Sequence, residues 1–415
     1  MARILMHTLL FPPDANSNAY MFADLATELK DLGHEIVVLT TTPHYAVEKE
    51  SLLHQPLRAV RGQWLWRSDY RSIACFHIAV PQKKGGIVTR IKTAIRFHCL
   101  GLIATMDSEF KCDIVFSQSP PLTIGLLSAW MARKHGAKSI YVAQDIFPDG
   151  LIQQGRIKNS FIIWLLRILE RSVYKHSDAV CSISDGLVRV LSTRVPKSTL
   201  LCTIPNFANS TIYHPLPREN DFAREHSLND MFVISYIGNL GNAQDFSPVL
   251  SSADVCRDLP IKFLLIGSGI KEKLLAAEIA RKELDNVILM SYQPRELTPM
   301  INAASDLCLV LLSPHVRNFS FPSKIYSLMA CGKPILLYGC PEADIARFVR
   351  DTGIGWVVEN GDIDGFVKTL RHLYNHRTEL EECAKRALVS MQEHYTEKVV
   401  SRQYNELIHS LMVSK

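Results

Sequence analysis

The feature of this sequence that most constrains its fold is a repeated alternation of short apolar runs and amphipathic stretches. An apolar run at residues 3–10 is followed by apolar residues at helical spacing from Phe22 to Leu29, and a second apolar run follows at residues 36–41. A strand, a helix and a strand in this order imply a crossover connection, so the two strands lie parallel in one sheet. The alternation therefore predicts an α/β fold.

The alternation occurs in two series, which predicts two domains because 415 residues are too many for one compact core. Further strands of the first series are expected at residues 113–117, 139–143, 179–183 and 200–204. Strands of the second series are expected at residues 232–237, 261–266, 287–290, 307–311, 334–338 and 356–358.

The polar, aperiodic segment 209–230 separates the two series and is predicted to be a linker. The domains are therefore expected at residues 1–212 and 231–396, with a C-terminal helix within 397–415 packing back on the first domain. Two such doubly wound, Rossmann-like sheets are expected to direct the carboxyl ends of their strands into a shared cleft, where ligands bind.

Composition excludes several classes of protein. A net charge of +5 is mild for this length, and no dense basic block typical of a nucleic-acid-binding protein is present. Ten cysteines occur without C-x-x-C spacing, which favours buried thiols in a reducing compartment over disulfides or metal ligands. The chain starts directly with a predicted strand and its apolar runs are shorter than the roughly 18 residues of a spanning helix, so we expect a cytoplasmic protein that at most rests on a membrane.

Two glycine-containing loops in the second series are candidates for ligand binding. The strand that ends at Ile237 runs into Gly238 and Gly241 before the next helix, and glycines there let the backbone and a helix N-terminus approach a phosphate. An ordinary strand-to-helix turn explains the same pattern equally well. Gly267 and Gly269 flank Ser268 after the next strand, and close contact with a base or ribose is a weaker prediction there.

Lys324 is the best single candidate for contact with an anion. Pro322 suits the first position of a helix, so Ser323 and Lys324 would lie in the first turn. A cation in the first turn opposes the helix dipole unless an anion is bound nearby. A solvated lysine is the alternative interpretation.

In the first series, Asp145 follows a strand directly and is expected to project at its carboxyl end. Carboxylates at such positions also serve as helix caps or turn residues, so the residue alone does not indicate catalysis. Asp14, His7 and His44 occupy comparable positions, and a lone histidine there is more often structural.

Ten short motifs, from residues 11–14 through 145–149 and 236–244 to 329–334, occur in an order and spacing that together resemble the family 4 retaining glycosyltransferases. The resemblance spans nearly the whole chain, and it points to the branch similar to the N-acetylfucosamine transferases of bacterial capsule and O-antigen synthesis. It implies the two-domain glycosyltransferase B type fold. The motifs lie at residues 11–14, 33–35, 43–45, 145–149, 204–207, 236–244, 267–269, 292–294, 322–324 and 329–334.

By this resemblance the second domain binds a nucleotide sugar with a UDP group. The phosphates would contact the glycine loop, residues 292–294 would line the base pocket, and Lys324 would neutralise the diphosphate. The implied donor site comprises Gly238, Asn239, Gln244, Gly267, Ser268, Gly269, Tyr292, Gln293, Pro294, Arg317, Ser323, Lys324 and Ser327.

The sequence departs from the family pattern in the donor site. Two glutamates that hold the sugar and ribose in many members are replaced by Phe319 and Ser327. A basic pair after the glycine loop is replaced by Asn239 and Gln244, which leaves more of the phosphate charge to Lys324 and Arg317. The histidine that many relatives carry after the fourth strand is absent, and Gln144 and Asp145 stand in that region.

The resemblance also implies that the first domain binds the acceptor, a saccharide linked to polyprenyl diphosphate. The acceptor-binding candidates are Asp14, Asn16, His44 and Tyr45, and Asp145 is the catalytic candidate. The family retains the anomeric configuration and needs no metal or other cofactor, so protein donors and cations stabilise the leaving diphosphate. Front-face attack, with the acceptor hydroxyl bonded to the departing phosphate, is the favoured mechanism.

Two basic amphipathic segments are candidates for contact with the inner leaflet of a membrane. We favour membrane contact for the first, whereas for the second, residues 156–175 with Phe161 and Trp164, core packing is at least as plausible. The basic residues of the first segment are Lys83, Lys84, Arg90, Lys92 and Arg96.

Two other functions remain open. A nucleotide-sugar epimerase of the same fold acts on the donor alone, and the basic amphipathic segment would then have no purpose. A non-catalytic subunit that binds a partner glycosyltransferase would account for the missing glutamates.

Overall fold

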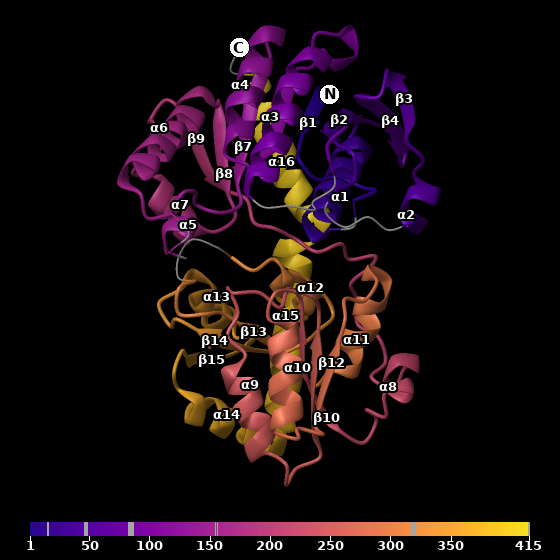
Figure 1. Ribbon diagram of the computed structural model, residues 1–415, viewed down its shortest axis with the longest axis vertical. Coiled ribbons are helices and arrows are strands. Elements are labelled where there is room, and N and C mark those ends of the chain that lie inside the picture. Colours follow the sequence, from indigo (N-terminus) through magenta and orange to yellow (C-terminus); the bar gives the residue numbers. More distant parts are fainter. Residues whose placement is uncertain are drawn as a thin grey trace. The chain divides into compact units, whose positions relative to one another are not determined.

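The computed structural model describes residues 1–14, 16–44, 49–81, 87–153, 155, 157–316 and 321–413. The chain divides into two compact units, Met1–Pro205 with Glu397–Lys415, and Asn206–Thr396. Each unit is an α/β body built around one sheet (Figure 1). The predicted fold class is confirmed for both units.

The first unit contains a nine-stranded sheet in the order β3-β4-β5-β2-β1-β6-β7-β8-β9. Among the described strands β4 pairs antiparallel with β3 and β5, and the other pairs are parallel. The strand order reverses between β1 and β6, where doubly wound proteins bind ligands. The strands are β1 Arg3–His7, β2 Glu35–Thr41, β3 Arg58–Arg61, β4 Leu65–Tyr70, β5 Ile73–Ile78, β6 Ile114–Gln118, β7 Lys138–Ala143, β8 Ala179–Ser182 and β9 Leu200–Thr203.

All six strands predicted for the first series are present, but β3, β4 and β5 were not anticipated. β3 is fully exposed, and in β4 only Leu65 and Ser68 are buried, so neither strand shows the continuous apolar run of a central parallel strand. β5 is buried apart from Ala74. Its six residues include Cys75 and His77, which interrupt the apolar run, so no clear strand pattern is visible in the sequence there.

Helices cover the first sheet on both faces. Right-handed crossovers place α1 on one face and α3, α4 and α6 on the other, and α4 contacts both α3 and α6. The helices of this unit are α1 Ser17–Asp31, α2 Lys49–His54, α3 Ile87–Ala104, α4 Thr123–His135, α5 Asp149–Gln153, α6 Ser160–His176, α7 Asp185–Leu191 and α16 Glu397–Val413.

The C-terminal helix α16 packs on the first unit, beside α1. The ring of Tyr404 meets that of Phe116 at 5.1 Å between centroids. His34, in the turn after α1, shares a 2.8 Å hydrogen bond between its Nε2 and Asn405 Oδ1. These contacts explain why the helix groups with a domain that is nearly 200 residues earlier in the sequence.

The second unit contains a six-stranded parallel sheet in the order β12-β11-β10-β13-β14-β15. Numbered within the unit this order is 3-2-1-4-5-6, and it reverses between β10 and β13. All the predicted strands of the second series are present. They are β10 Phe232–Ile237, β11 Ile261–Ile266, β12 Val287–Met290, β13 Leu307–Leu311, β14 Ile335–Gly339 and β15 Gly355–Glu359.

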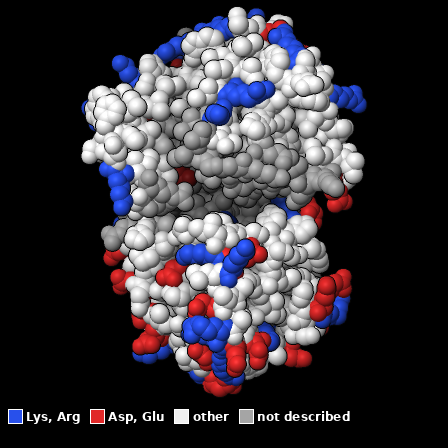
Figure 2. Space-filling view, in the orientation of Figure 1, with Lys and Arg blue, Asp and Glu red and all other residues white. Residues whose placement is uncertain are grey.

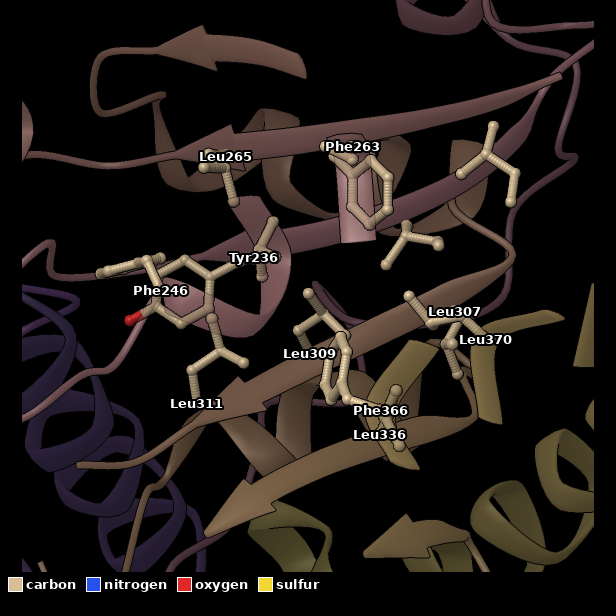
Figure 3. Packing of buried hydrophobic residues seen from close by; sticks show 14 of the residues in the cluster. Tyr236, Phe246, Phe263, Leu265, Leu307, Leu309, Leu311, Leu336, Phe366 and Leu370 are labelled. Carbon is tan, nitrogen blue, oxygen red and sulfur yellow. The ribbon is translucent and has the colours of Figure 1, made fainter. Parts of the chain in front are cut away.

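Alternating residues of β10 serve two separate cores, one on each face of this sheet. Phe232, Ile234 and Tyr236 belong to the cluster drawn in Figure 3, which includes Phe366 of the covering helix α14. Val233 belongs to the cluster on the other face. The helices of this unit are α8 Asp221–Glu225, α9 Ser247–Val255, α10 Glu272–Arg281, α11 Thr298–Ala304, α12 Lys324–Ala330, α13 Asp344–Thr352, α14 Ile363–Asn375 and α15 Arg377–Ser390.

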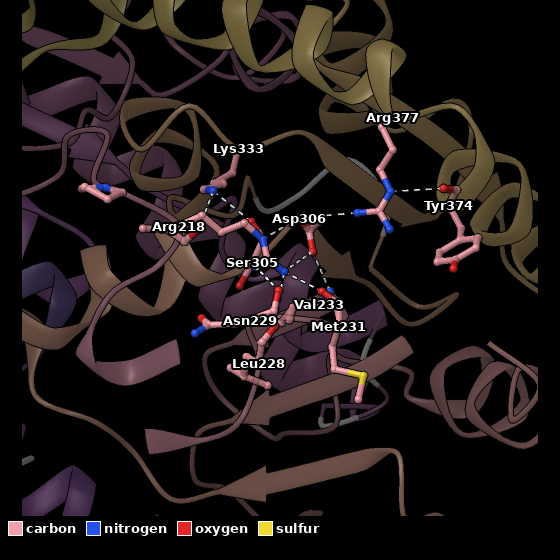
Figure 4. A network of polar contacts seen from close by, with 12 residues as sticks. Arg218, Leu228, Asn229, Met231, Val233, Ser305, Asp306, Lys333, Tyr374 and Arg377 are labelled. Carbon is pink, nitrogen blue, oxygen red and sulfur yellow. Dashed lines mark hydrogen bonds and ion pairs between the residues drawn. The ribbon is translucent and has the colours of Figure 1, made fainter. Parts of the chain in front are cut away.

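The segment expected to be a linker, residues 209–230, belongs to the second unit instead. Arg218 forms an ion pair with Asp306 at 3.0 Å and donates to the carbonyl of Asn229 at 2.9 Å (Figure 4). Phe222 and Leu228 of the same segment are buried in the core. The polar sequence therefore reflects a surface layer fixed by distant partners, and the boundary lies at residue 206.

No helix in the part of the chain that the structure describes is long and apolar enough to span a bilayer.

Candidate functional site

The loops after β10 and β11 are held together by their backbones at the carboxyl edge of the second sheet. The amide of Gly238 donates to the carbonyl of Ile266 at 2.9 Å, and that of Leu240 donates to Ser268 at 3.0 Å. A Cβ atom at Gly267 would lie 1.7 Å from the carbonyl oxygen of Gly238, and one at Gly269 would lie 2.3 Å from that of Leu240. Gly267 and Gly269 are therefore explained by loop packing, while their contact with a base or ribose stays a prediction.

Gly238 has a different reason to be glycine. Its φ of +148° is a conformation that other residues rarely adopt. A Cβ atom there would meet no backbone; it would lie 3.5 Å from Tyr236 Oη and 3.6 Å from Lys324 Nζ. The missing side chain leaves the approach to the lysine ammonium group open on this side.

Lys324 holds its ammonium group at the point where the strand order reverses. Its Nζ lies 3.6 Å from the centroid of the Tyr236 ring and 3.4 Å from the carbonyl oxygen of Ile237, the last residue of β10. The Tyr236 hydroxyl donates to the carbonyl of Asn239 at 2.8 Å, which fixes the ring beneath the ammonium. Within the described ranges no carboxylate forms a salt bridge with Lys324.

Burial lowers the pKa of Lys324 to about 7, because desolvation disfavours the charged form. The residue as a whole is half-buried, so the ammonium is withdrawn from water although Lys324 is not sealed inside the unit. A bound anion would favour the charged form and raise the pKa again. A desolvated lysine with a lowered pKa is typical of a site that binds an anionic ligand.

The surroundings of Lys324 differ in detail from the sequence prediction. Helix α12 begins at Lys324 with Ser323 as its N-cap, so Pro322 precedes the helix and is not its first residue. The Ser323 side chain makes no capping hydrogen bond. The Ser327 hydroxyl donates to the carbonyl of Lys324 at 2.8 Å, within the helix.

The remaining donor-site candidates gather at the same edge of the sheet. Gln244 uses its Oε1 to accept from the amide of Gly241 at 3.2 Å, so this oxygen shapes the glycine loop. The amide of Ser313, after β13, donates to the carbonyl of Ala243 at 2.9 Å and joins the two strands of the switch point. Arg317 lies outside the described residues. Of the other candidates, Gln293 is half-buried, and the exposed ones are Asn239, Ser268, Tyr292 and Pro294.

In the first unit Asp145 is exposed, two residues after the end of β7. The preceding Gln144 is buried. Its backbone amide donates to Ser119 Oγ at 3.0 Å, and its side-chain Nε2 donates to Gln118 Oε1 at 3.4 Å. These bonds tie the Asp145 loop to the end of β6, the strand beside the reversal point. An exposed carboxylate on an anchored loop is compatible with the catalytic assignment, which stays a prediction.

Asp149, in the same motif, has a structural role that the sequence did not reveal. Arg167 binds both of its oxygens at 2.7 Å, and Arg194 binds Oδ2 at 2.6 Å. Both arginines also contact the buried Glu170. Burial would raise the pKa of Asp149, but the hydrogen bonds from Arg167 and Arg194 outweigh it and hold the pKa below its usual value.

Asp14 and His44, predicted to bind the acceptor, are brought together and are both buried. Asp14 Oδ2 accepts from the backbone amide of His44 at 2.9 Å, and His44 Nδ1 lies 3.0 Å from Thr41 Oγ1. Asn16 caps helix α1 by accepting from the amide of Asn18 at 2.9 Å. These contacts shape the loops after β1 and β2, whereas Tyr45 lies outside the described residues.

His7, at the end of β1, is fully buried, stacks on Phe97 and shares a 2.9 Å hydrogen bond with Ser128 Oγ. Burial, with a smaller contribution from His98, lowers its pKa to about 3. His7 is therefore a neutral core residue, as expected for a lone histidine.

One group among the described residues places possible metal ligands near one another: His372, His376 and Glu379. The two imidazole rings stack with 4.1 Å between centroids and 19° between planes. Nearly parallel rings cannot both point a lone pair at one ion, and His372 Nε2 is already 2.8 Å from Glu379 Oε1. The group lies at the end of α14, away from the glycine loop, and independence from metal stays a prediction.

Two family descriptions match the chain. The Glycosyl transferase 4-like domain matches residues 19–206, and Glycosyl transferases group 1 matches residues 231–376. The chain belongs to the family 4 glycosyltransferases. The two matches fall on the first and second units, so the sequence-based family resemblance is confirmed.

Relatives and a solved structure agree with this family. The chain is 28% identical over 251 residues to "Probable glycosyltransferase WbjE" of Pseudomonas aeruginosa, a match that covers 59% of this chain and 62% of WbjE, less than two thirds of its length. It is 22% identical over 400 residues to "Putative colanic acid biosynthesis glycosyl transferase WcaI" of Escherichia coli, covering 93% of this chain and 96% of WcaI. HepE of Anabaena, solved with UDP-glucose, is 15% identical with a TM-score of 0.73, covers 99% and 100% of the two chains, and shows the shared fold.

Proposed function

We propose that this glycosyltransferase transfers a sugar from a UDP-sugar to a lipid-linked saccharide in the synthesis of a bacterial surface polysaccharide. The donor would be an N-acetylhexosamine or a deoxyhexosamine. The names of WcaI and WbjE support the polysaccharide and transferase parts of this proposal. The UDP-glucose complex of HepE, which has the same fold, supports a UDP-linked donor.

The observation that carries the proposal is the Lys324 ammonium at the reversal point of the second sheet. It is desolvated, lies over an aromatic ring and faces a glycine without a side chain. A diphosphate bound against the glycine loop would restore the charge of this lysine and would be held by it. As the sugar leaves, negative charge grows on the diphosphate, and a fixed cation then stabilises the transition state.

The remaining steps are those that the family resemblance implies. The acceptor hydroxyl attacks the anomeric carbon on the face from which UDP departs, the bond from that carbon to the diphosphate oxygen breaks, and the hydroxyl proton passes to a diphosphate oxygen. The configuration at the anomeric carbon is thereby retained. Asp145, exposed on the loop after β7, would orient the acceptor hydroxyl, and the reaction would need no metal.

Calorimetric titration with UDP, GDP and ADP tests the donor assignment. We expect UDP to bind best and Lys324→Ala to weaken UDP binding by about 1.5–3 kcal/mol, the range for a hydrogen bond to a charged group. Lys273→Ala removes an exposed cation of helix α10 in the same unit and should bind UDP normally. Absence of binding by every nucleotide would contradict a donor site, and an unchanged affinity in Lys324→Ala would contradict the role of this lysine.

Transfer assays test the reaction itself. UDP-N-acetylhexosamines would be incubated with a polyprenyl-diphosphate saccharide, and the product linkage would be analysed by NMR. We expect a lipid-linked product with the donor's anomeric configuration and undiminished rates in EDTA. Epimerised UDP-sugar without transfer would instead support the epimerase, and an inverted linkage would contradict the mechanism.

A further inference from the structure

The outward face of helix α6 is unusually apolar for a surface helix. Phe161, Trp164, Leu165 and Ile168 are 68%, 57%, 51% and 44% exposed. Their spacing of three and four residues places them on one stripe of the helix, and Phe161 stacks on Trp164 at 5.7 Å. Core packing, which the sequence left at least as plausible as membrane contact for this segment, does not take place for these side chains.

The same stripe becomes basic toward the end of the helix. Arg171 and Lys175 continue the helical spacing from Ile168 and are exposed, and Lys158 is exposed just before the helix begins. The opposite face is conventional, because Val173 and Tyr174 are buried against the unit. Helix α6 therefore presents an apolar half and a basic half to its surroundings.

The helices beside α6 carry the same character. Helix α4 exposes Trp130 with Lys134 over its ring at 5.5 Å, and α3 exposes Ile95 and Ile103. Across the described residues of α3, α4 and α6 the one acidic residue is Glu170, which is buried and bound by two arginines. The layer thus offers large apolar and basic side chains to its surroundings without an exposed carboxylate.

We infer that this layer is a docking surface for an anionic lipid bilayer, with the apolar half of α6 inserted among the headgroups. Tryptophan and phenylalanine suit the interfacial region, and basic side chains beside them attract anionic lipids. The complete absence of exposed acid from the three described helices matches a negatively charged surface more closely than a protein partner of mixed charge. The face of the first unit that is seen in Figure 2 carries scattered basic residues, in blue, and few acidic ones, in red.

The ion-pair cluster behind α6 connects this surface to the acceptor side. Arg167, on the buried flank of α6, binds both oxygens of Asp149, four residues after Asp145. Helix α6 is therefore fixed rigidly against the loop that carries the catalytic candidate. A bilayer contact here rests on the proposed function for its purpose, because a polyprenyl-linked acceptor lies in the membrane and must reach that loop.

Sedimentation with vesicles tests the surface directly. We expect the wild-type chain to bind phosphatidylcholine vesicles with 30% phosphatidylglycerol and to bind pure phosphatidylcholine vesicles at least tenfold less. Phe161→Ser/Trp164→Ser should reduce binding to the anionic vesicles by at least about tenfold. Ile270→Ser/Leu274→Ser, which removes two exposed apolar residues of the second unit, should bind like the wild type.

Charge is tested with a second matched pair. Arg171→Gln/Lys175→Gln should lower binding to anionic vesicles by about tenfold, whereas Lys368→Gln/Lys385→Gln, two exposed lysines of the second unit, should not. Equal binding by the α6 variants and their controls would overturn the inference. So would concentration-dependent self-association of the wild type that the α6 substitutions abolish, since a second copy would then cover this face.

Insertion is tested with brominated lipids, which quench nearby tryptophans. Retaining only Trp164 should give strong quenching on anionic vesicles, and retaining only Trp356 of the second unit should give none; no quenching of Trp164 would overturn insertion. UDP titration of every variant keeps the two proposals apart. A variant that no longer binds vesicles but binds UDP normally tests the docking surface alone. A wild-type protein that binds vesicles but not UDP contradicts the proposed function alone.

Discussion

Both units share the same strand order at the centre of their sheets, yet they differ in charge. The first unit carries 27 Lys and Arg against 18 Asp and Glu residues, and the second carries 19 against 23. Helices α10, α14 and α15 of the second unit mix acidic and basic residues. The face of this unit that is seen in Figure 2 carries interspersed red and blue. In the described parts of α3, α4 and α6 of the first unit, the one acidic residue is Glu170, and it is buried.

The carboxyl edges of the two sheets also differ in whether their charged groups are paired. In the first unit the Asp149 carboxylate, near the end of β7, is neutralised within the protein by Arg167 and Arg194. In the second unit Lys324 is desolvated and has no carboxylate bound to it among the described residues. The first unit thus has a prearranged ion-pair cluster near its strand ends and the second has, within its described residues, an unpaired cation, a difference that agrees with the proposed acceptor and donor roles.

The largest expected effect concerns Asp145. Asp145→Asn keeps the shape of the side chain and removes its charge, so the acceptor hydroxyl should be oriented less well and transfer should fall by at least about 10²-fold. UDP affinity should stay unchanged, because the donor is assigned to the second unit. Steady-state transfer rates and UDP titration measure the two quantities.

Glu109→Gln neutralises another exposed carboxylate of the first unit and serves as the control. Full transfer activity in Asp145→Asn would remove the catalytic assignment and leave the first unit as a binding surface. An equal loss of activity in Glu109→Gln would show that general charge, and not Asp145, is responsible.

The next effect sharpens the contrast between buried and exposed charge. Glu170→Ala leaves Arg167 and Arg194 with one carboxylate instead of two, and removing one partner from a buried cluster should cost about 3 kcal/mol of stability. Glu278→Ala breaks a surface pair with Arg281 on α10 and should leave the stability almost unchanged, because water and salt screen exposed charges. Denaturant unfolding of both variants makes the comparison, and similar losses would contradict a structural role for the cluster.

The sequence predicted the parallel strands well because buried strands are continuous apolar runs, as in residues 232–237. It missed β3 and β4 because an exposed edge hairpin has no such run. It also misplaced residues 209–230, since the anchor of Arg218 is Asp306, 88 residues away. Non-local partners of this kind leave no local pattern.

The candidate site was predicted to the same extent and for the same reason. Lys324 stood out because a cation in the first helical turn is unfavourable by itself. Its platform, Tyr236, did not stand out, because the contact joins residues that are far apart in the chain. Helix α6 shows a further limit: helical spacing reveals an apolar stripe, but it does not tell whether that stripe faces a core or the surroundings.

A smaller effect tests the unsatisfied cation through pH. In the proposed donor site the protonated form of Lys324 binds the diphosphate, and its pKa of about 7 in the free protein should rise when the anion is bound. UDP affinity should therefore fall by up to about tenfold per pH unit above pH 7, until the pKa of the complex is reached. The diphosphate of UDP keeps a constant charge over this range because the second pKa of a terminal phosphate is about 6. Calorimetry from pH 7 to 9 should show this slope in the wild type and none in Lys324→Gln; parallel slopes would contradict it.

The smallest expected effect is a gain in stability. The pKa of Lys324 is about 7 in the folded chain and about 10.4 in an unfolded one, so the unfolded state holds more protons between these values. Stability should therefore rise as pH increases from 7 to 10, and the full cost of charging a desolvated lysine is present below pH 7. Lys324→Met, which keeps the length of the side chain, should stabilise the ligand-free protein by about 1 kcal/mol or more at pH 6 and by less at pH 10. A stability that is unchanged at pH 6, or changed equally at both pH values, would mean that the ammonium is well solvated, and the second unit would then hold no unsatisfied charge to contrast with the first.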